Sequence, residues 1–357
     1  MVAHLAKKIP FIRRLVEERD AVVAEHSTST GVTADDIIAC MEMILGRTPD
    51  PELVEHHLQR GFPDRFALGK YMINTREFQN RYAAAMPNFR PASVFLGDRI
   101  LTLTHRGNII YLAPGDNDLT PWITLYGEWE PHVENTILDM LRPGDTVIDI
   151  GANVGYHTLA MANGVGSGGQ IHAFEANPEA MRLLRATMSL NAFGWIRLYE
   201  KAVLDRPGTF TLASDPDHFG SGHVITDRQS SDYGASYSKR VEVASVTLDA
   251  ELAHKVGTVD LIHMDIEGSE PLALRGGQVL IERSPNIKII TEWSVGMMGA
   301  RADVGEYIAW LVKLGFSFWL IEAASALTKI EPSSALTLPH CDLMLSRNKP
   351  PCYGTSC

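Results

Sequence analysis

The segment DTVIDIGANVGYHT, residues 145–158, constrains the fold of this chain more than any other. An apolar strand leads into a turn and then into a helix, and the marked positions around the turn are Asp149, Gly151, Asn153 and Gly155. Glycine permits a tight turn and the close approach of another group to the backbone. A strand, a glycine-rich turn and a helix in this order predict a unit of an open α/β sheet with a ligand crevice at its carboxyl edge.

The spacing within this turn distinguishes two kinds of cofactor. A dinucleotide-binding turn has the pattern G-x-G-x-x-G and holds a diphosphate at the helix N-terminus. Here the third position of that pattern is Asn153, so the pattern is broken. The D-x-G-x-N-x-G turn instead suits S-adenosylmethionine, which has no phosphate, because Asp149 can accept a hydrogen bond from the ammonium of its methionine part, directly or through water.

A second acidic residue stands where such a cofactor would need it. Glu175 ends the next predicted strand, 175 − 155 = 20 residues after Gly155. A carboxylate at that strand end can accept hydrogen bonds from both ribose hydroxyls. Asn177, before Pro178, is predicted to cap the following helix.

A third motif, LIHMDIEGSEPLALRGG at residues 261–277, brings three titratable side chains together. On a strand, His263, Asp265 and Glu267 share one face. Titratable groups that meet at the ligand edge of a sheet are candidates for a functional site. The alternative is structural: Glu267 caps the helix that begins at Ser269, and His263 is a core histidine.

The rest of the chain predicts how this sheet is completed. Apolar runs predict strands at residues 146–150, 170–175, 196–203, 259–266 and 287–293. Helices are expected between most of them, at about residues 155–163, 178–191, 269–283 and 303–314. This alternation is typical of a parallel sheet with helices on both faces. The runs at 316–323 and 341–346 predict two closing strands, one of them antiparallel.

The N-terminal part follows different periodicities. Residues 1–26 and 32–83 have helical spacing around a linker at 26–31, with helix signals at Thr33–Asp36, Gly46 and Pro51. Between residues 93 and 114 the period changes to two around Arg106-Gly107, which predicts a hairpin. The predicted parts are a helical region at 1–90, a β-hairpin connector at 91–125, an α/β domain at 126–347 and a tail at 348–357.

Composition limits the partners and the compartment. The net charge is 32 − 43 = −11, which disfavours nucleic acid as a partner. The sequence has no run of 18 apolar residues, so no transmembrane segment is expected. Four cysteines in 357 residues are few, and a reducing cytoplasm is the expected location.

Taken in order, the motifs resemble the FkbM-type methyltransferase family, a branch of the class I S-adenosylmethionine-dependent enzymes. The resemblance spans residues 126–347 and also includes GEWEP (127–131), KAVLD (201–205), VTLD (246–249), MDIEGSE (264–270) and TEW (291–293). The family usually has lysine where this chain has His263. The segment LGRTPD, 45–50, is similar to a small helical module with an LGR-x-PD signature that often accompanies enzymes acting on bacterial glycans.

The resemblance implies a Rossmann-like sheet of seven strands with the last strand antiparallel. It also implies cofactor contacts at Glu130, Asp149, Gly151, Ala152, Asn153, Gly155, Glu175, Ala176, Ala202 and Asp265. Ala202 would lie near the adenine, Glu130 near the methionine end, and Asp265 near the transferred methyl group and the acceptor.

We expect an O-methyltransferase that acts on a small-molecule or glycan acceptor, at a hydroxyl of a sugar. The alternatives are O- or N-methylation of a polyketide or peptide natural product, and a non-catalytic scaffold with a degenerate methyltransferase fold. The catalytic candidates are Asp265, His263, Glu267 and His157, with Asp265 positioning the acceptor and His263 or His157 removing its proton. A Mg²⁺ ion held by Asp265, Glu267 and Glu292 is a less favoured way to activate the hydroxyl.

Two expectations concern surfaces. The polar, glycine-rich residues 214–239 predict a loop over the crevice, in which His218, His223, Tyr233 and Tyr237 contact the acceptor. The alternative is a disordered surface insertion. For a homodimer, the helical region and the hairpin are the expected contact surfaces.

Overall fold

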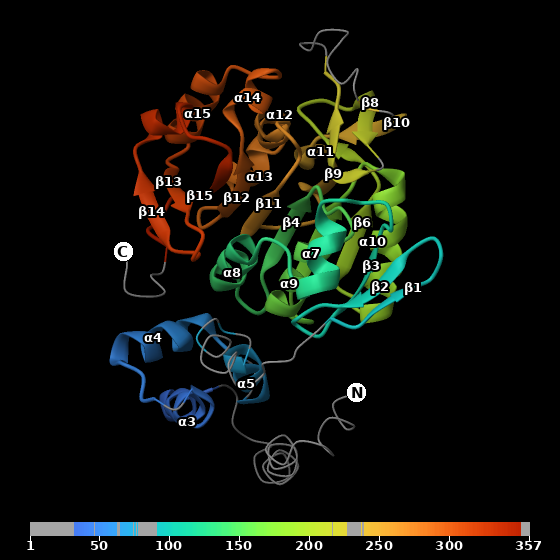
Figure 1. The fold of residues 1–357 in the computed structure, drawn as a ribbon. Helices are drawn as coiled ribbons and strands as arrows, with labels where there is room; N and C mark the ends of the chain where they lie inside the picture. The colour runs from blue at the N-terminus through green and yellow to red at the C-terminus, as the bar shows by residue number, and fades with distance from the viewer. Residues whose placement is uncertain are drawn as a thin grey trace. The chain divides into compact units, whose positions relative to one another are not determined.

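The computed structural model describes residues 32–45, 47–62, 65–73, 75, 77, 91–215, 217–226, 237 and 239–350 (Figure 1). The helix predicted at 1–26, its linker, the last seven residues, Gly46 and Tyr233 lie outside this part. The chain divides into two compact units, Met1–Pro87 and Asn88–Cys357. No helix in the described ranges is long and apolar enough to cross a lipid bilayer.

The described part of the first unit forms three short helices around a small apolar core: α3 (Ala34–Leu45), α4 (Pro51–Arg60) and α5 (Arg65–Ile73). The predicted capping box is present. Thr33 N donates to Asp36 Oδ2 at 2.9 Å, and Asp36 N donates to Thr33 Oγ1 at 3.2 Å. The LGR-x-PD segment has structural roles. Asp50 caps α4 by accepting from Leu53 N at 2.8 Å, and Arg47 pairs with Glu77.

The second unit is built on a large mixed sheet. In spatial order its strands are β14 (Leu327–Ile330), β13 (Ser317–Ile321), β15 (Cys341–Ser346), β12 (Lys288–Trp293), β11 (Leu261–Met264), β4 (Thr146–Ile150), β5 (Gln170–Phe174) and β6 (Ile196–Tyr199). The inner strands from β6 to β12 are parallel, and β15 runs antiparallel to both of its neighbours, as predicted. The eighth strand, β14, was not predicted; it forms a hairpin with β13 at the edge.

Helices cover both faces of this sheet, as the alternation predicted (Figure 1). One apolar core includes α7 (Leu119–Tyr126), α8 (Pro131–Met140), α9 (Tyr156–Val165) and α10 (Pro178–Asn191). The other includes α11 (Leu248–Leu252), α12 (Glu270–Arg275), α13 (Gln278–Glu282), α14 (Val295–Gly299), α15 (Val304–Lys313) and the 3₁₀ helix η1 (Pro332–Leu336). The buried apolar sides of β4, β5 and β11 contribute to both cores, which explains their nearly continuous hydrophobic sequences.

The segment predicted as a hairpin connector forms a three-stranded antiparallel sheet, β1 (Ser93–Phe95), β2 (Ile100–Leu103) and β3 (Ile109–Leu112). The turn at Arg106-Gly107 is as predicted, and a further turn at Gly97 makes two strands where one was expected. This sheet packs on α10, where Asn191 Oδ1 accepts from Ile109 N at 3.0 Å and Thr187 Oγ1 accepts from Tyr111 N at 3.0 Å. It is therefore part of the second unit.

The prediction of a loop at residues 214–239 was wrong for the described residues of that segment. Most of them belong to strands of a second sheet with the order β7 (Ala202–Val203), β10 (Lys239–Val246), β8 (Gly208–Asp215) and β9 (His218–Val224). The run predicted as one strand at 196–203 is therefore divided between two sheets. The helix predicted at 269–283 is also divided, into α12 and α13. Where the chain bends between them, it packs closely on Leu204: a Cβ added at Gly276 would lie 2.2 Å from Leu204 O.

Candidate active site

A cavity opens at the carboxyl ends of β4, β5 and β11, where an α/β sheet of this kind binds its ligand. The space within it, open solvent included, is about 670 Å³. Six of the predicted site residues line it: Gly151, Asn153, Glu175, Ala176, Ala202 and Asp265. The described lining does not include the other seven, which are Glu130, Asp149, Ala152, Gly155, His157, His263 and Glu267.

The glycines of the β4–α9 turn are required by the protein's own packing. Gly151 and Gly155 have φ angles of 84° and 98°, in the region that favours glycine. A Cβ at Gly151 would lie 1.9 Å from the backbone oxygen of Asp265, and one at Gly155 would lie 2.6 Å from the side chain of Leu184. From the sequence, these glycines were expected to let a cofactor approach the backbone. In the structure, the atoms nearest to them belong to the end of β11 and to α10.

Glu175 is held at the cavity by backbone groups. Its Oε2 accepts from Asn153 N at 2.7 Å and its Oε1 accepts from Asn177 N at 2.6 Å. Burial raises the pKa of Glu175 to about 7, against the two backbone hydrogen bonds, which lower it. Because each carboxylate oxygen has a second lone pair, both oxygens can accept a further hydrogen bond from a hydroxyl group. The side chain therefore suits a ribose diol.

The opposite part of the lining is apolar and partly comes from the unpredicted sheet. Its members include Ala202, Val203, Leu204, Leu212, Phe219 and Val224. Gly220 and Gly222 of β9 also line the cavity and have no side chains to fill it. The strand is anchored by Asp116, whose Oδ1 accepts from Phe219 N at 3.0 Å. This apolar part suits an adenine ring, and the placement of the adenine near Ala202 stays a prediction.

Asp149 and His263 form a buried pair behind the lining. Asp149 is fully buried, with His263 Nδ1 at 2.9 Å from its Oδ1, while Thr158 Oγ1 donates to its Oδ2 at 2.5 Å. His263 is only 4% exposed. Both oxygens of Asp149 thus have protein partners, and its contact with the methionine ammonium stays a prediction.

A second histidine is oriented by a carboxylate. His157 Nε2 lies 3.3 Å from Glu130 Oε2, and its ring centroid lies 5.0 Å from that of His263. Burial disfavours the charged form of His157, but the hydrogen bond and the charge of Glu130 outweigh burial and raise its pKa. Among the described residues, none provides a hydrogen-bond partner for His157 Nδ1. The ring therefore has one oriented nitrogen and one nitrogen that no described residue pairs with.

Three carboxylates gather beyond the end of β11. One oxygen each of Asp265, Glu267 and Glu292 lies within 4.8 Å of the others. Burial, and after it repulsion from neighbouring carboxylates that include Glu270, raise the pKa of Asp265 well above its usual range, that of Glu267 to about 7 and that of Glu292 to about 9. The charge of Glu130 contributes to all three shifts, which places it near the cluster. Such a group favours a bound cation or retained protons.

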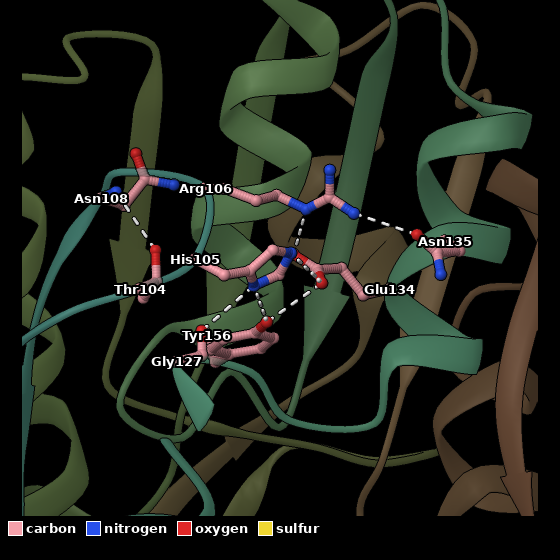
Figure 2. Close-up of polar contacts among 8 residues, drawn as sticks. All are labelled: Thr104, His105, Arg106, Asn108, Gly127, Glu134, Asn135 and Tyr156. Atoms are coloured by element: carbon pink, nitrogen blue, oxygen red, sulfur yellow. Dashed lines mark hydrogen bonds and ion pairs between the residues drawn. The ribbon is translucent and has the colours of Figure 1, made fainter. Parts of the chain in front are cut away.

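A buried polar network supports the backbone around this site (Figure 2). Its centre is Glu134 of α8, which is 2% exposed. Arg106 Nε donates to Glu134 Oε1 at 2.7 Å, and Tyr156 Oη donates to Glu134 Oε2 at 3.0 Å. Arg106 also donates to Asn135 Oδ1 at 3.0 Å. The β2–β3 turn is thereby fixed to the first turns of α8 and α9.

The same network reaches the backbone of the GEWEP segment. His105 Nδ1 lies 3.1 Å from the carbonyl oxygen of Gly127, and its Nε2 lies 3.6 Å from Glu134 Oε2 (Figure 2). Gly127 leads to Glu130, and Tyr156 precedes His157. The three-stranded sheet therefore positions both segments that carry the Glu130–His157 pair, a role that sequence periodicity gave no means to predict.

The sheet order, with β15 antiparallel, and the cavity lined by Glu175 define a class I S-adenosylmethionine-dependent methyltransferase. Residues 149–318 match the family model of the methyltransferase FkbM domain, so this part of the chain is a domain of that family. This confirms the resemblance that the motifs carried and shows that the protein is an enzyme. No curated protein matches the chain in sequence.

Several solved methyltransferase structures overlap the chain. The O-methyltransferase from Bacillus cereus is 13% identical, with 66% of this chain and 83% of that chain covered and a TM-score of 0.35. The O-methyltransferase from Thermotoga maritima is 13% identical, with 72% and 86% covered and a TM-score of 0.34. The precorrin-6y C5,15-methyltransferase from Geobacter metallireducens is 12% identical, with 60% and 86% covered and a TM-score of 0.34. The family assignment rests on the domain match.

Proposed function

We propose that the protein methylates a hydroxyl of a sugar or glycan. The observation that carries this proposal is the Glu130–His157 pair, in which one histidine nitrogen is oriented and the other, Nδ1, is unpaired among the described residues. A hydroxyl is a poor nucleophile until its proton leaves, and a positioned base contributes about 10²–10⁴-fold to such a step. A histidine of this kind suits oxygen methylation.

S-adenosylmethionine supplies the methyl group from its positively charged sulfur. The residues of the chain would bind and align the donor: Glu175 would accept hydrogen bonds from the ribose hydroxyls, and the apolar lining around Ala202 would hold the adenine. Alignment of the donor with the acceptor oxygen can contribute up to about 7–11 kcal/mol to the lowering of the barrier.

The carboxylates of Asp265, Glu267 and Glu292 complement this chemistry in two ways. Their mutual repulsion is relieved when a cationic donor is bound nearby, which favours their ionised forms. Ionised carboxylates also accept hydrogen bonds from hydroxyl groups, so the cluster suits an acceptor with several hydroxyls, such as a sugar ring.

In the reaction, His157 Nδ1 takes the proton of the acceptor hydroxyl, and Glu130 stabilises the resulting imidazolium at Nε2. His263 stays the second candidate for this part: its Nδ1 is held by Asp149, its side chain is 5% exposed, and its ring centroid lies 5.0 Å from that of His157. Asp265, at the cavity, positions the acceptor.

A divalent cation is the alternative means of activating the hydroxyl. The three clustered carboxylates offer oxygen ligands of the kind that Mg²⁺ prefers, and a bound cation would lower the pKa of a coordinated hydroxyl. Dialysis against EDTA separates the two mechanisms. Full activity after dialysis supports the histidine mechanism, whereas lost activity that Mg²⁺ restores supports the metal.

The proposal is tested with a panel of acceptors: sugars and glycans, polyketide and peptide hydroxyls, and amines. Mass spectrometry then identifies which products gain one methyl group. We expect transfer to sugar hydroxyls; transfer only to amines or to natural-product hydroxyls would contradict the proposal. If the protein does not bind S-adenosylhomocysteine, the result would favour the alternative of a non-catalytic scaffold.

The role of the base is tested with His157→Asn. We expect kcat to fall by about 10²–10⁴-fold while the affinity for S-adenosylhomocysteine is retained. His132→Asn is a matched control, because His132 also pairs with a carboxylate, with its Nε2 at 2.9 Å from Asp342 Oδ2. Equal losses of kcat in the two variants would contradict the assignment.

A further inference from the structure

Ser269 is an unexplained polar residue of the cofactor cavity. It lines the cavity, it is 2% exposed, and no described residue provides a hydrogen-bond partner for its hydroxyl. A buried hydroxyl without a partner is rare and unfavourable, because the group has lost its hydrogen bonds to water. A ligand that enters the cavity could restore a bond to it.

The position of Ser269 in the fold does not explain this hydroxyl. The residue precedes α12 as its N-cap, where serine normally accepts a backbone hydrogen bond, but its side chain makes none. Glu270 accepts hydrogen bonds from the nearby backbone instead: its Oε1 accepts from Ile266 N at 3.1 Å and from Gly268 N at 3.2 Å. The serine side chain is thus left without a structural role.

Three other polar side chains in the lining have partners, whereas Asn153 Oδ1, like the Ser269 hydroxyl, has none among the described residues. Glu175 accepts from two backbone N–H groups, Asn177 Oδ1 accepts from Glu179 N at 3.0 Å, and Lys201 Nζ donates to Glu251 Oε2 at 2.8 Å. Ser269 lines the same cavity as Ile266 and the apolar residues assigned above to the adenine. A hydroxyl there can donate to a ring nitrogen or accept from the exocyclic amine.

We propose that Ser269 accepts a hydrogen bond from the exocyclic amine of the adenine and so helps the enzyme to select an adenosyl cofactor. The inference rests on the family's cofactor and does not depend on the identity of the acceptor. It can therefore fail while the proposed glycan methylation holds, and the reverse is also true.

The experiment compares Ser269→Ala with the wild-type full chain by titration calorimetry with S-adenosylhomocysteine and by thermal denaturation. We expect the affinity to fall about tenfold, equivalent to about 1.4 kcal/mol. We also expect the melting temperature of the ligand-free variant to be unchanged or higher, because the substitution removes an unpaired buried hydroxyl. The increase in melting temperature on adding the ligand should be smaller than in the wild type.

Ser284→Ala is the matched control. Ser284 is 1% exposed and lies outside the described cavity lining, and its hydroxyl both donates to Leu280 O at 2.7 Å and accepts from Val259 N at 2.9 Å. This variant should lower the melting temperature of the free protein and leave ligand affinity unchanged.

A second ligand makes the test specific to the base. An analogue of S-adenosylhomocysteine with purine in place of adenine, which lacks the exocyclic amine, should bind the wild type more weakly and should lose less affinity on Ser269→Ala. Unchanged affinity of Ser269→Ala for S-adenosylhomocysteine would overturn the proposal and leave the hydroxyl to a water molecule. Equal losses for both ligands would overturn recognition of the amine and place the bond on another part of the cofactor.

Discussion

Replacing Gly151 with alanine tests the packing that brings the end of β11 to the β4–α9 turn. The backbone of Gly151 is left-handed, with φ 84°. That conformation costs a residue with a Cβ about 1–2 kcal/mol. The new Cβ would also lie 1.9 Å from the backbone oxygen of Asp265, which cannot rotate away. Overpacking of this kind costs about 1–3 kcal/mol more. We therefore expect Gly151→Ala to lower the free energy of unfolding by about 2–5 kcal/mol.

Gly107→Ala separates these two contributions. Gly107 also has a positive φ, 80°, but a Cβ there would meet no atom within 4 Å. Only the backbone contribution of about 1–2 kcal/mol applies to this control. Urea denaturation measures both variants, with unchanged m-values as the condition for comparing them. Equal losses of stability would refute the close approach of Asp265 to Gly151.

Three further predictions concern the surroundings of the site. Arg106→Ala leaves Glu134 buried without its cation and should lower the free energy of unfolding by about 3–5 kcal/mol in urea denaturation. A loss below about 1 kcal/mol would contradict the network of Figure 2. The pKa of Glu292 is raised from 4.5 to about 9, so the folded state binds more protons than the unfolded state, and stability should fall as the pH rises from about 5 to 9. Glu292→Gln should reduce this fall in stability. An unchanged dependence of the free energy of unfolding on pH would contradict the raised pKa of Glu292. Asp116→Ala removes the acceptor of Phe219 N on β9. Calorimetry should then show S-adenosylhomocysteine binding weakened about threefold to tenfold, which corresponds to the loss of one hydrogen bond. Unchanged affinity would show that β9 is held by other contacts.

The sequence predicts the central part of the sheet well because that part has strong local signals. The apolar run TVIDI coincides with β4, and the predicted helix at 178–191 coincides with α10. This helix begins at Pro178, and Asn177 is its N-cap residue. Buried parallel strands are apolar on both faces, so their ends are visible as changes in composition. The place of Glu175 follows from the same regularity.

The remaining parts depend on contacts that are distant in sequence. The β9 strand, HFGSGHV, is polar and rich in glycine, and it becomes a strand by pairing with β8 and by its bond to Asp116. The pairing of His263 with Asp149 spans 114 residues, so spacing alone could not separate a catalytic histidine from a buried one. The unpaired hydroxyl of Ser269 is apparent only when its described neighbours have been placed.

The central claim is that the cavity beside Glu175 binds S-adenosylmethionine. Its most direct test is calorimetric titration of the full chain with S-adenosylhomocysteine, repeated with the Glu175→Ala variant after its fold has been checked by circular dichroism. We expect one binding site per chain and a loss of at least tenfold in affinity in the folded variant, since hydrogen bonds from the ribose to a charged acceptor are worth about 1.5–3 kcal/mol each. Binding of equal strength to both proteins would contradict it.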